Sequence, residues 1–73
     1  FRGKRLKIIK TLPHPKGGDD IPGTVRVEGN RLFVSTGRGE LEILCLQPEG
    51  KRPMTSGEFL RGYHPRNGER LGL

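Results

Sequence analysis

Hydrophobic and polar positions alternate in four short segments of the chain. This pattern is typical of β-strands, because successive side chains along a strand point to opposite faces. Glycine-containing pairs and triplets such as Gly29-Asn30 separate the last three segments, and these residues tolerate the positive φ angles of tight turns. We therefore predict antiparallel strands over residues 4–12, 23–28, 31–36 and 40–47.

The strand predicted over residues 40–47 has apolar side chains on both faces. A strand with one face in water seldom carries large apolar residues on that face. We expect one face to fill a barrel and the other to pack beneath a helix or a neighbouring domain. Along this strand, Leu41, Ile43 and Cys45 alternate with Glu40, Glu42 and Leu44, and the second face is apolar at Leu44 and Leu46.

A short helix is predicted after the last strand, over residues 55–61. Thr55 and Glu58 have the spacing of a capping box, in which each side chain bonds to the backbone of the other residue. Gly62 and Pro65 favour an end to the helix, and Phe59 offers an apolar anchor. Short strands, glycine-rich turns and one helix predict a mainly β fold, a small barrel of five or six strands.

The composition limits the chain to one small domain, residues 1–73. With 12 glycines and 6 prolines, it is rich in turns. No apolar run approaches the roughly 20 residues that span a bilayer, so we predict no membrane association. The chain begins at Phe1, without methionine, which we interpret as the start of a fragment of a longer protein. The single cysteine, Cys45, cannot form an internal disulfide, in keeping with a cytoplasmic protein.

The net charge of +6 is unevenly distributed. A positive excess attracts polyanions through its long-range field. Two interpretations remain open from charge alone: a face that binds nucleic acid, or a solvated strand face. The first acidic residue is Asp19, and it is preceded by a run of basic residues, Arg2, Lys4, Arg5, Lys7 and Lys10.

Residues for catalysis or metal binding are too few and too scattered. His14 and His64 each precede a proline in a predicted loop, and Cys45 is distant from both in the sequence. A metal site needs several such ligands at suitable spacing. Gly37-Arg38-Gly39 lacks the frame of a phosphate-binding P-loop. We predict that the chain itself is not catalytic and binds no metal.

Residues 46–62, LQPEGKRPMTSGEFLRG, resemble the C-terminal domain of the methionyl-tRNA formyltransferases. In that family a strand ends in a similar LQPEGK segment, and a methionine, a small polar residue and an F-L-x-G helix end follow. The loop over residues 13–21 departs from the family pattern. Weaker similarities cover most of the remaining chain, at residues 3–8, 22–25, 32–41 and 68–71.

The resemblance implies an OB-like barrel that helps to hold initiator methionyl-tRNA. It also implies an N-terminal catalytic domain with a Rossmann-like fold, which is absent here. That domain would bind 10-formyltetrahydrofolate and transfer its formyl group to the methionine amine, so no cofactor is expected in this chain. The implied parent protein is a cytoplasmic monomer.

From charge and placement we predict phosphate contacts, which would fix the position of an RNA without reading its sequence. Phe33 and Tyr63 are the candidates for base stacking, and we expect Phe33 to be in the core instead. Few stacking aromatics favour a structured RNA backbone over a single strand. The residues predicted to bind RNA are Arg5, Lys7, Arg38, Lys51 and Arg52.

Two alternatives to tRNA binding remain. The first is a structural C-terminal domain of a formyltransferase that acts on sugar nucleotides or folate, where the basic face would be incidental. The second is a free-standing basic RNA-binding module.

Overall fold

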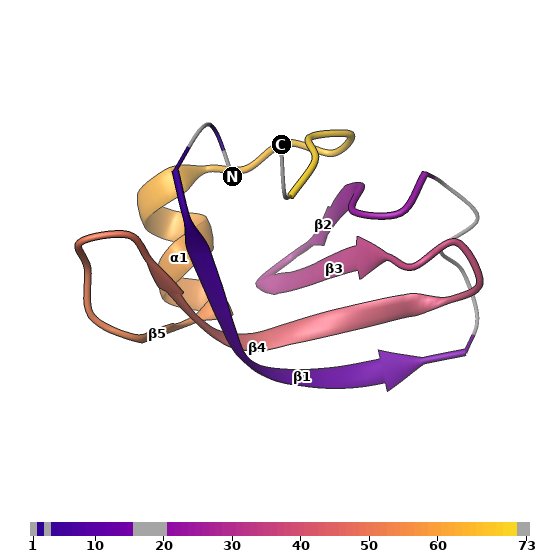
Figure 1. The fold of residues 1–73 in the computed structure, drawn as a ribbon, viewed down its shortest axis with the longest axis horizontal. Helices are drawn as coiled ribbons and strands as arrows, with labels where there is room; N and C mark the ends of the chain where they lie inside the picture. Colours follow the sequence, from indigo (N-terminus) through magenta and orange to yellow (C-terminus); the bar gives the residue numbers. More distant parts are fainter. Residues whose placement is uncertain (1, 3, 16–20, 72–73) are drawn as a thin grey trace.

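The computed structural model describes residues 2, 4–15 and 21–71. Within this part of the chain all strand pairs are antiparallel, and one helix follows them (Figure 1). The prediction of a mainly β fold with one short helix is confirmed. The elements are β1 (Leu6–His14), β2 (Val25–Glu28), β3 (Arg31–Ser35), β4 (Glu40–Pro48), β5 (Met54–Thr55) and α1 (Ser56–Tyr63).

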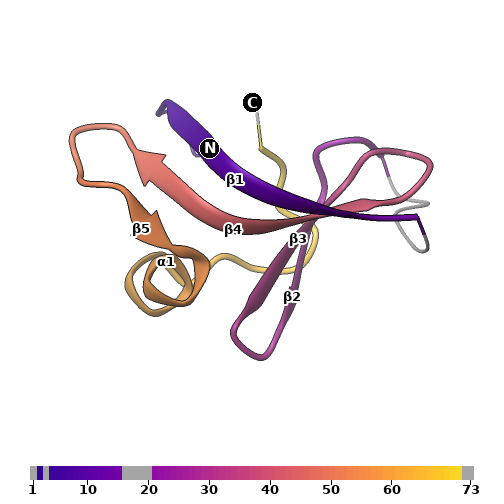
Figure 2. The ribbon, with the colours of Figure 1, turned by 90° about the horizontal axis from the view of Figure 1, so that it is seen from below.

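Strand β4 is the centre of the sheet, whose order is β1-β4-β3-β2. β1 pairs with β4 along one side, over the full length of both strands. The other side of β4 is shared, with β3 along its first half and β5 along its second half. Figure 2 shows α1 and the β2–β3 hairpin on the same side of the curved β1–β4 ribbon, where they enclose the core.

Two irregularities bend the β1–β4 pair. The register shifts twice, so that Ile9 in β1 and Leu44 in β4 are both left without a partner in the register. Such bulges increase the local twist and bend the strand. Leu44 is an additional residue in β4, so the next side chain after Ile43 that points into the core is that of Leu46. Ile43 and Leu46 are 2% and 0% exposed. The predicted alternation through Cys45 therefore fails at this point.

The main core lies between the sheet and α1. Phe59 of α1 is 1% exposed and packs with Leu32 of β3 and Leu46 of β4. This arrangement confirms that the apolar anchor predicted for the helix docks onto the sheet. The remaining buried members of the core are Val25, Ile43 and Leu60.

The predicted capping box is present at the start of α1. Thr55 Oγ1 accepts a hydrogen bond from the Glu58 backbone N–H at 3.3 Å, and Glu58 Oε1 accepts one from the Thr55 N–H at 3.1 Å. The helix continues through Gly62 to Tyr63, so the predicted end at residue 61 is too early. His64 ends it by adopting a left-handed conformation, with φ 47°.

The barrel is open, because β1 and β2 are not paired with each other. Residues 68–71 instead lie along the start of β2, where the Val25 N–H donates to the Glu69 carbonyl at 2.7 Å. Arg2 then donates to both carboxylate oxygens of Glu69, at 2.9 and 3.0 Å. Residues 68–71 and the side chain of Arg2 thus lie where a closed barrel would have β1 paired with β2. The predicted barrel is therefore a loose one.

The first strand differs from its prediction at both ends. The sequence predicts residues 4–12, whereas the strand is observed over Leu6–His14. Proline donates no backbone hydrogen bond, but it is tolerated at the edge of a sheet, and β1 pairs only with β4. Pro13 therefore does not end the strand. The rest of the predicted loop lies partly outside the described residues, at 16–20.

Candidate nucleic-acid interface

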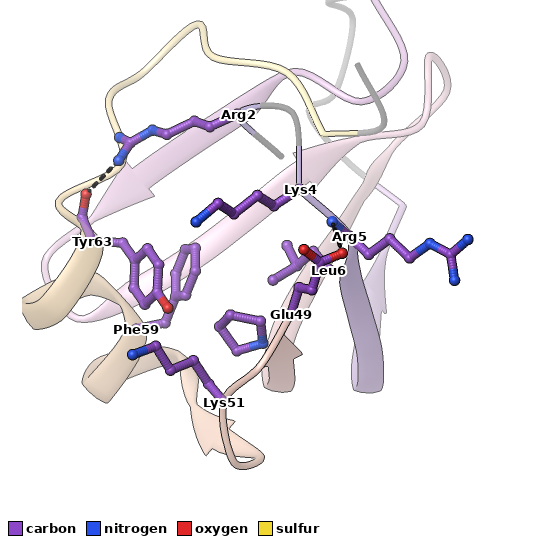
Figure 3. Close-up of a pocket in the computed structure, with 9 residues that line it drawn as sticks. Arg2, Lys4, Arg5, Leu6, Glu49, Lys51, Phe59 and Tyr63 are labelled. Atoms are coloured by element: carbon purple, nitrogen blue, oxygen red, sulfur yellow. Dashed lines mark hydrogen bonds between the residues drawn. The ribbon is translucent and has the colours of Figure 1, made fainter.

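A pocket of about 270 Å³ lies at one end of the molecule (Figure 3). The start of the chain, the loop between β4 and β5, and α1 enclose it. Four basic side chains and one acidic side chain line this pocket, so its charge is strongly positive. The lining residues are Arg2, Lys4, Arg5, Leu6, Pro48, Glu49, Lys51, Phe59 and Tyr63.

The inner wall of the pocket is apolar and its outer edge is cationic. Leu6, Pro48 and Phe59 form the wall, and the ring of Tyr63 stacks on that of Phe59 with centroids 4.7 Å apart. Figure 3 shows Lys4 and Lys51 extending toward these two rings from opposite sides of the pocket.

A tight turn places Lys51 beside the start of the chain. The Lys51 N–H donates to the Pro48 carbonyl at 3.0 Å, and Gly50 supplies a positive φ of 75° within this turn. The Glu49 N–H donates to the Arg5 carbonyl at 3.0 Å, which joins the turn to the chain just before β1. Lys51 and the residues at the start of the chain therefore meet through backbone contacts.

Arg2 fastens the start of the chain to the end of α1. Its guanidinium donates to the Tyr63 carbonyl at 2.9 Å and to the His64 carbonyl at 3.4 Å. Its hydrogen bonds to Glu69 lower the pKa of that carboxyl, as does the bond from the Arg66 backbone N–H. Arg2 therefore acts chiefly in holding the pocket together.

The structure brings only part of the predicted site together. Arg5 and Lys51 line the same pocket, although the Arg5 guanidinium turns away from its interior (Figure 3). Arg52 follows Lys51 in the loop, and Lys7 is exposed on β1 opposite Gln47. The site prediction omitted Lys4. Lys4 belongs to the run of basic residues at the start of the chain, which could have suggested it as a site residue. The sequence does not show, however, that the β4–β5 loop folds against this run.

Arg38 does not join the other predicted residues. Its turn joins β3 to β4, at the other end of the 31 Å long axis from α1 (Figure 1). The turn lies against the end of β1, because a Cβ on Gly39 would be 2.7 Å from the His14 carbonyl oxygen. A phosphate in the pocket is therefore out of reach of Arg38.

A second charged cluster covers Phe33 on the outer face of the sheet. Arg26 donates to both oxygens of Glu40, at 2.8 and 2.9 Å, and Arg31 to both oxygens of Glu42, at 3.0 and 2.8 Å. Their guanidinium carbons lie 4.2 and 4.9 Å from the centre of the Phe33 ring. Phe33 is 3% exposed, so its predicted burial is confirmed, although outside the main core cluster.

This second cluster predicts a loss of stability in acid. The hydrogen bond from Arg31, assisted by His14, lowers the pKa of Glu42 from 4.5 to about 2, and Arg26 lowers that of Glu40. Because the folded-state pKa is depressed, the stabilisation is complete above the unfolded value and is lost as the pH falls from about 4.5 toward 2. Urea unfolding at pH 6 and pH 3 should show this loss.

The matched variant for this pH measurement is Glu42→Gln. It keeps the shape of the side chain but has no carboxyl to titrate, so its stability should differ less between the two pH values. An equal fall in the parent and in Glu42→Gln would mean that other groups cause the acid sensitivity.

The described part of the chain holds neither a cluster of metal ligands nor a membrane-spanning helix. Among residues 2, 4–15 and 21–71, no three His, Cys, Asp or Glu side chains are grouped so that they could hold a metal ion. Within the same residues, no helix has the length and apolar character needed to cross a membrane.

Comparison with known proteins identifies the class of domain. The sequence profile of the formyl transferase C-terminal domain matches residues 1–64, and the chain belongs to this family. Among similar proteins, the methionyl-tRNA formyltransferase of Streptomyces avermitilis is 42% identical over 99% of the chain, and that of Chlorobium phaeovibrioides is 45% identical over 96%. The methionyl-tRNA formyltransferase of Dehalococcoides mccartyi is 42% identical over 100% of it.

The chain matches only one part of these relatives. It spans 23% of the Streptomyces and Chlorobium proteins and 24% of the Dehalococcoides protein. The relatives thus agree with the main interpretation of the sequence, a C-terminal formyltransferase domain, and give no support to the alternatives.

Proposed function

We propose that this chain is the tRNA-binding domain of a methionyl-tRNA formyltransferase. It holds initiator methionyl-tRNA in the cytoplasm while an N-terminal catalytic domain with bound 10-formyltetrahydrofolate formylates the methionine amine. The parent protein acts as a monomer, and the open sheet with its docked helix belongs to the OB-like class. The observation that carries this proposal is the cationic pocket, together with the names of the relatives.

The charge distribution favours one RNA-binding end. Lys4, Arg5 and Lys51 line the pocket, where the hydrogen bond from the Glu49 N–H to the Arg5 carbonyl joins the β4–β5 turn to the start of the chain, and Arg52 is the next residue of the loop. On the outer face, by contrast, the carboxylates of Glu40 and Glu42 pair with two arginines. A field concentrated at one end steers a polyanion to that end. Phosphates bound there would position the tRNA without discriminating its bases.

The test is a salt titration of tRNA binding to the parent and to the double variant Lys51→Ala/Arg52→Ala. The plot of log affinity against log salt should become shallower by about 0.9 for each phosphate that the variant no longer neutralises. All tRNAs should be weakened similarly, because contacts to the backbone do not read sequence. Filter binding or fluorescence anisotropy over a range of salt concentrations measures both the affinity and the slope.

The charge-matched control is Lys10→Ala/Arg38→Ala, which removes two positive charges outside the pocket. It should retain most of the affinity and the parental slope. Identical behaviour of the parent and Lys51→Ala/Arg52→Ala would remove both residues from the site. No binding by the parent at low salt would favour the structural domain of a related formyltransferase.

A further inference from the structure

The basic pocket has features that a bare phosphate does not need. Its inner wall is formed by Leu6, Pro48 and Phe59, which offer no hydrogen-bond donor to an anion. The apolar wall instead suits a ligand that carries an apolar, planar group next to its charge.

The aromatic pair makes this wall rigid. Phe59 is buried, and the half-buried ring of Tyr63 lies nearly parallel to it, at 16°. Arg2 fixes the backbone of Tyr63 through its carbonyl oxygen. A fixed aromatic surface is what proteins use to bind unpaired bases, because every base has a flat face that can stack.

The size of the pocket limits what can enter. Its volume of about 270 Å³ is near the lower limit, about 300 Å³, of sites for small ligands. A stacked helix is excluded, but a single nucleotide is of the right size. Lys4 and Lys51 approach the aromatic pair from opposite sides (Figure 3), so a phosphate at the edge of the pocket can meet the Lys51 ammonium group. The carboxylate of Glu49 is an acceptor for a ribose hydroxyl or a base amino group.

We propose that this pocket is a subsite for one unpaired nucleotide of the bound RNA. Its base packs against the half-buried ring of Tyr63 at the edge of the apolar wall, and its phosphate meets the ammonium group of Lys51. The inference rests on the proposed function, because the nucleotide would belong to the tRNA. It adds to our expectation from the sequence, which favoured contacts with the backbone of a structured RNA and named Tyr63 as a candidate for base stacking.

Tyr63 provides a direct spectroscopic test. It is the only tyrosine, and the chain has no tryptophan, so its fluorescence reports on the pocket. Adenosine 5′-monophosphate should quench the emission of the 73-residue chain in a saturable way, whereas inorganic phosphate at the same concentration should not. Lys51→Met removes the ammonium group and keeps an apolar stem, and it should need a higher concentration of the nucleotide.

The second arm measures tRNA binding by Tyr63→Leu, with Tyr63→Phe as the matched control. Loss of base stacking should weaken binding by at least about fivefold, without changing the salt slope, because stacking releases no counterions. Tyr63→Phe retains the ring and should bind like the parent. Thermal melts of the variants show whether they are folded. If Tyr63→Leu is unfolded, the fluorescence arm with Lys51→Met decides.

The outcomes separate this inference from the proposed function. If tRNA binding depends on Lys51 and Arg52, but Tyr63→Leu binds like the parent and the nucleotide does not quench, the subsite is overturned and the proposed function stands. If the nucleotide quenches saturably and no tRNA binds, the proposed function fails and the pocket is a nucleotide site of another kind. Equal effects of inorganic phosphate and the nucleotide would also overturn the subsite.

Discussion

Phe59→Ala should lower the free energy of unfolding by roughly 3–5 kcal/mol, the usual cost of removing a buried aromatic side chain. Phe59 is 1% exposed and joins α1 to the sheet. A domain of 73 residues has a total stability of roughly 4–11 kcal/mol, so this single change removes much of it. Urea denaturation followed by circular dichroism measures the loss.

The matched control for Phe59→Ala is Ile21→Ala, which also truncates an apolar side chain. Ile21 is 57% exposed, and the change should stay within about 0.5 kcal/mol of the parent. A parental unfolding midpoint for Phe59→Ala would show that α1 does not depend on this contact. The docking surface that positions Tyr63 in the pocket would then need another explanation.

The elements that the sequence predicted well depend on neighbours along the chain. Val25 and Val27 turn inward from β2 and Arg26 turns outward, as the alternation predicts. The capping box of α1 likewise requires only Thr55 and Glu58, three residues apart. Both patterns are local, so they are visible in a short stretch of sequence.

The elements that the sequence did not predict depend on partners distant along the chain. The bulges at Ile9 and Leu44 exist only in the pairing of β1 with β4. Glu42 is 7% exposed because Arg31 of β3 and His14 of β1 both bond to it. Alternation along β4 cannot show such partners, and it led us to expect a helix or a neighbouring domain over the face that does not fill the barrel.

The same distinction applies to the candidate site. The number and type of charges pointed to Arg5, Lys51 and Arg38 alike. Only the fold shows that the β4–β5 turn meets the start of the chain, while the β3–β4 turn lies at the opposite end. A basic residue at a turn is easily found from sequence, but its distance from other charges requires the complete topology.

The largest effect on function is expected from reversing the charges in the β4–β5 loop of a complete enzyme. This chain can replace the matching 23% of the Streptomyces avermitilis relative, and Lys51→Glu/Arg52→Glu can be introduced into the chimera. Repulsion of the tRNA phosphates should raise the KM for methionyl-tRNA about tenfold or more, and kcat should change by less than about twofold. Steady-state formylation assays over a range of methionyl-tRNA concentrations measure both constants.

The division between KM and kcat follows from where the loop acts. Contacts of Lys51 and Arg52 with the tRNA backbone are present both in the bound substrate and in the transition state, so removing them weakens both equally. The control is Lys10→Glu/Arg38→Glu in the same chimera, with the same change of charge away from the pocket. A similar rise in KM in this control would mean that net charge alone attracts the tRNA. A fall in kcat at unchanged KM would mean that the loop orients the methionine amine for reaction, and that its contacts form mainly in the transition state.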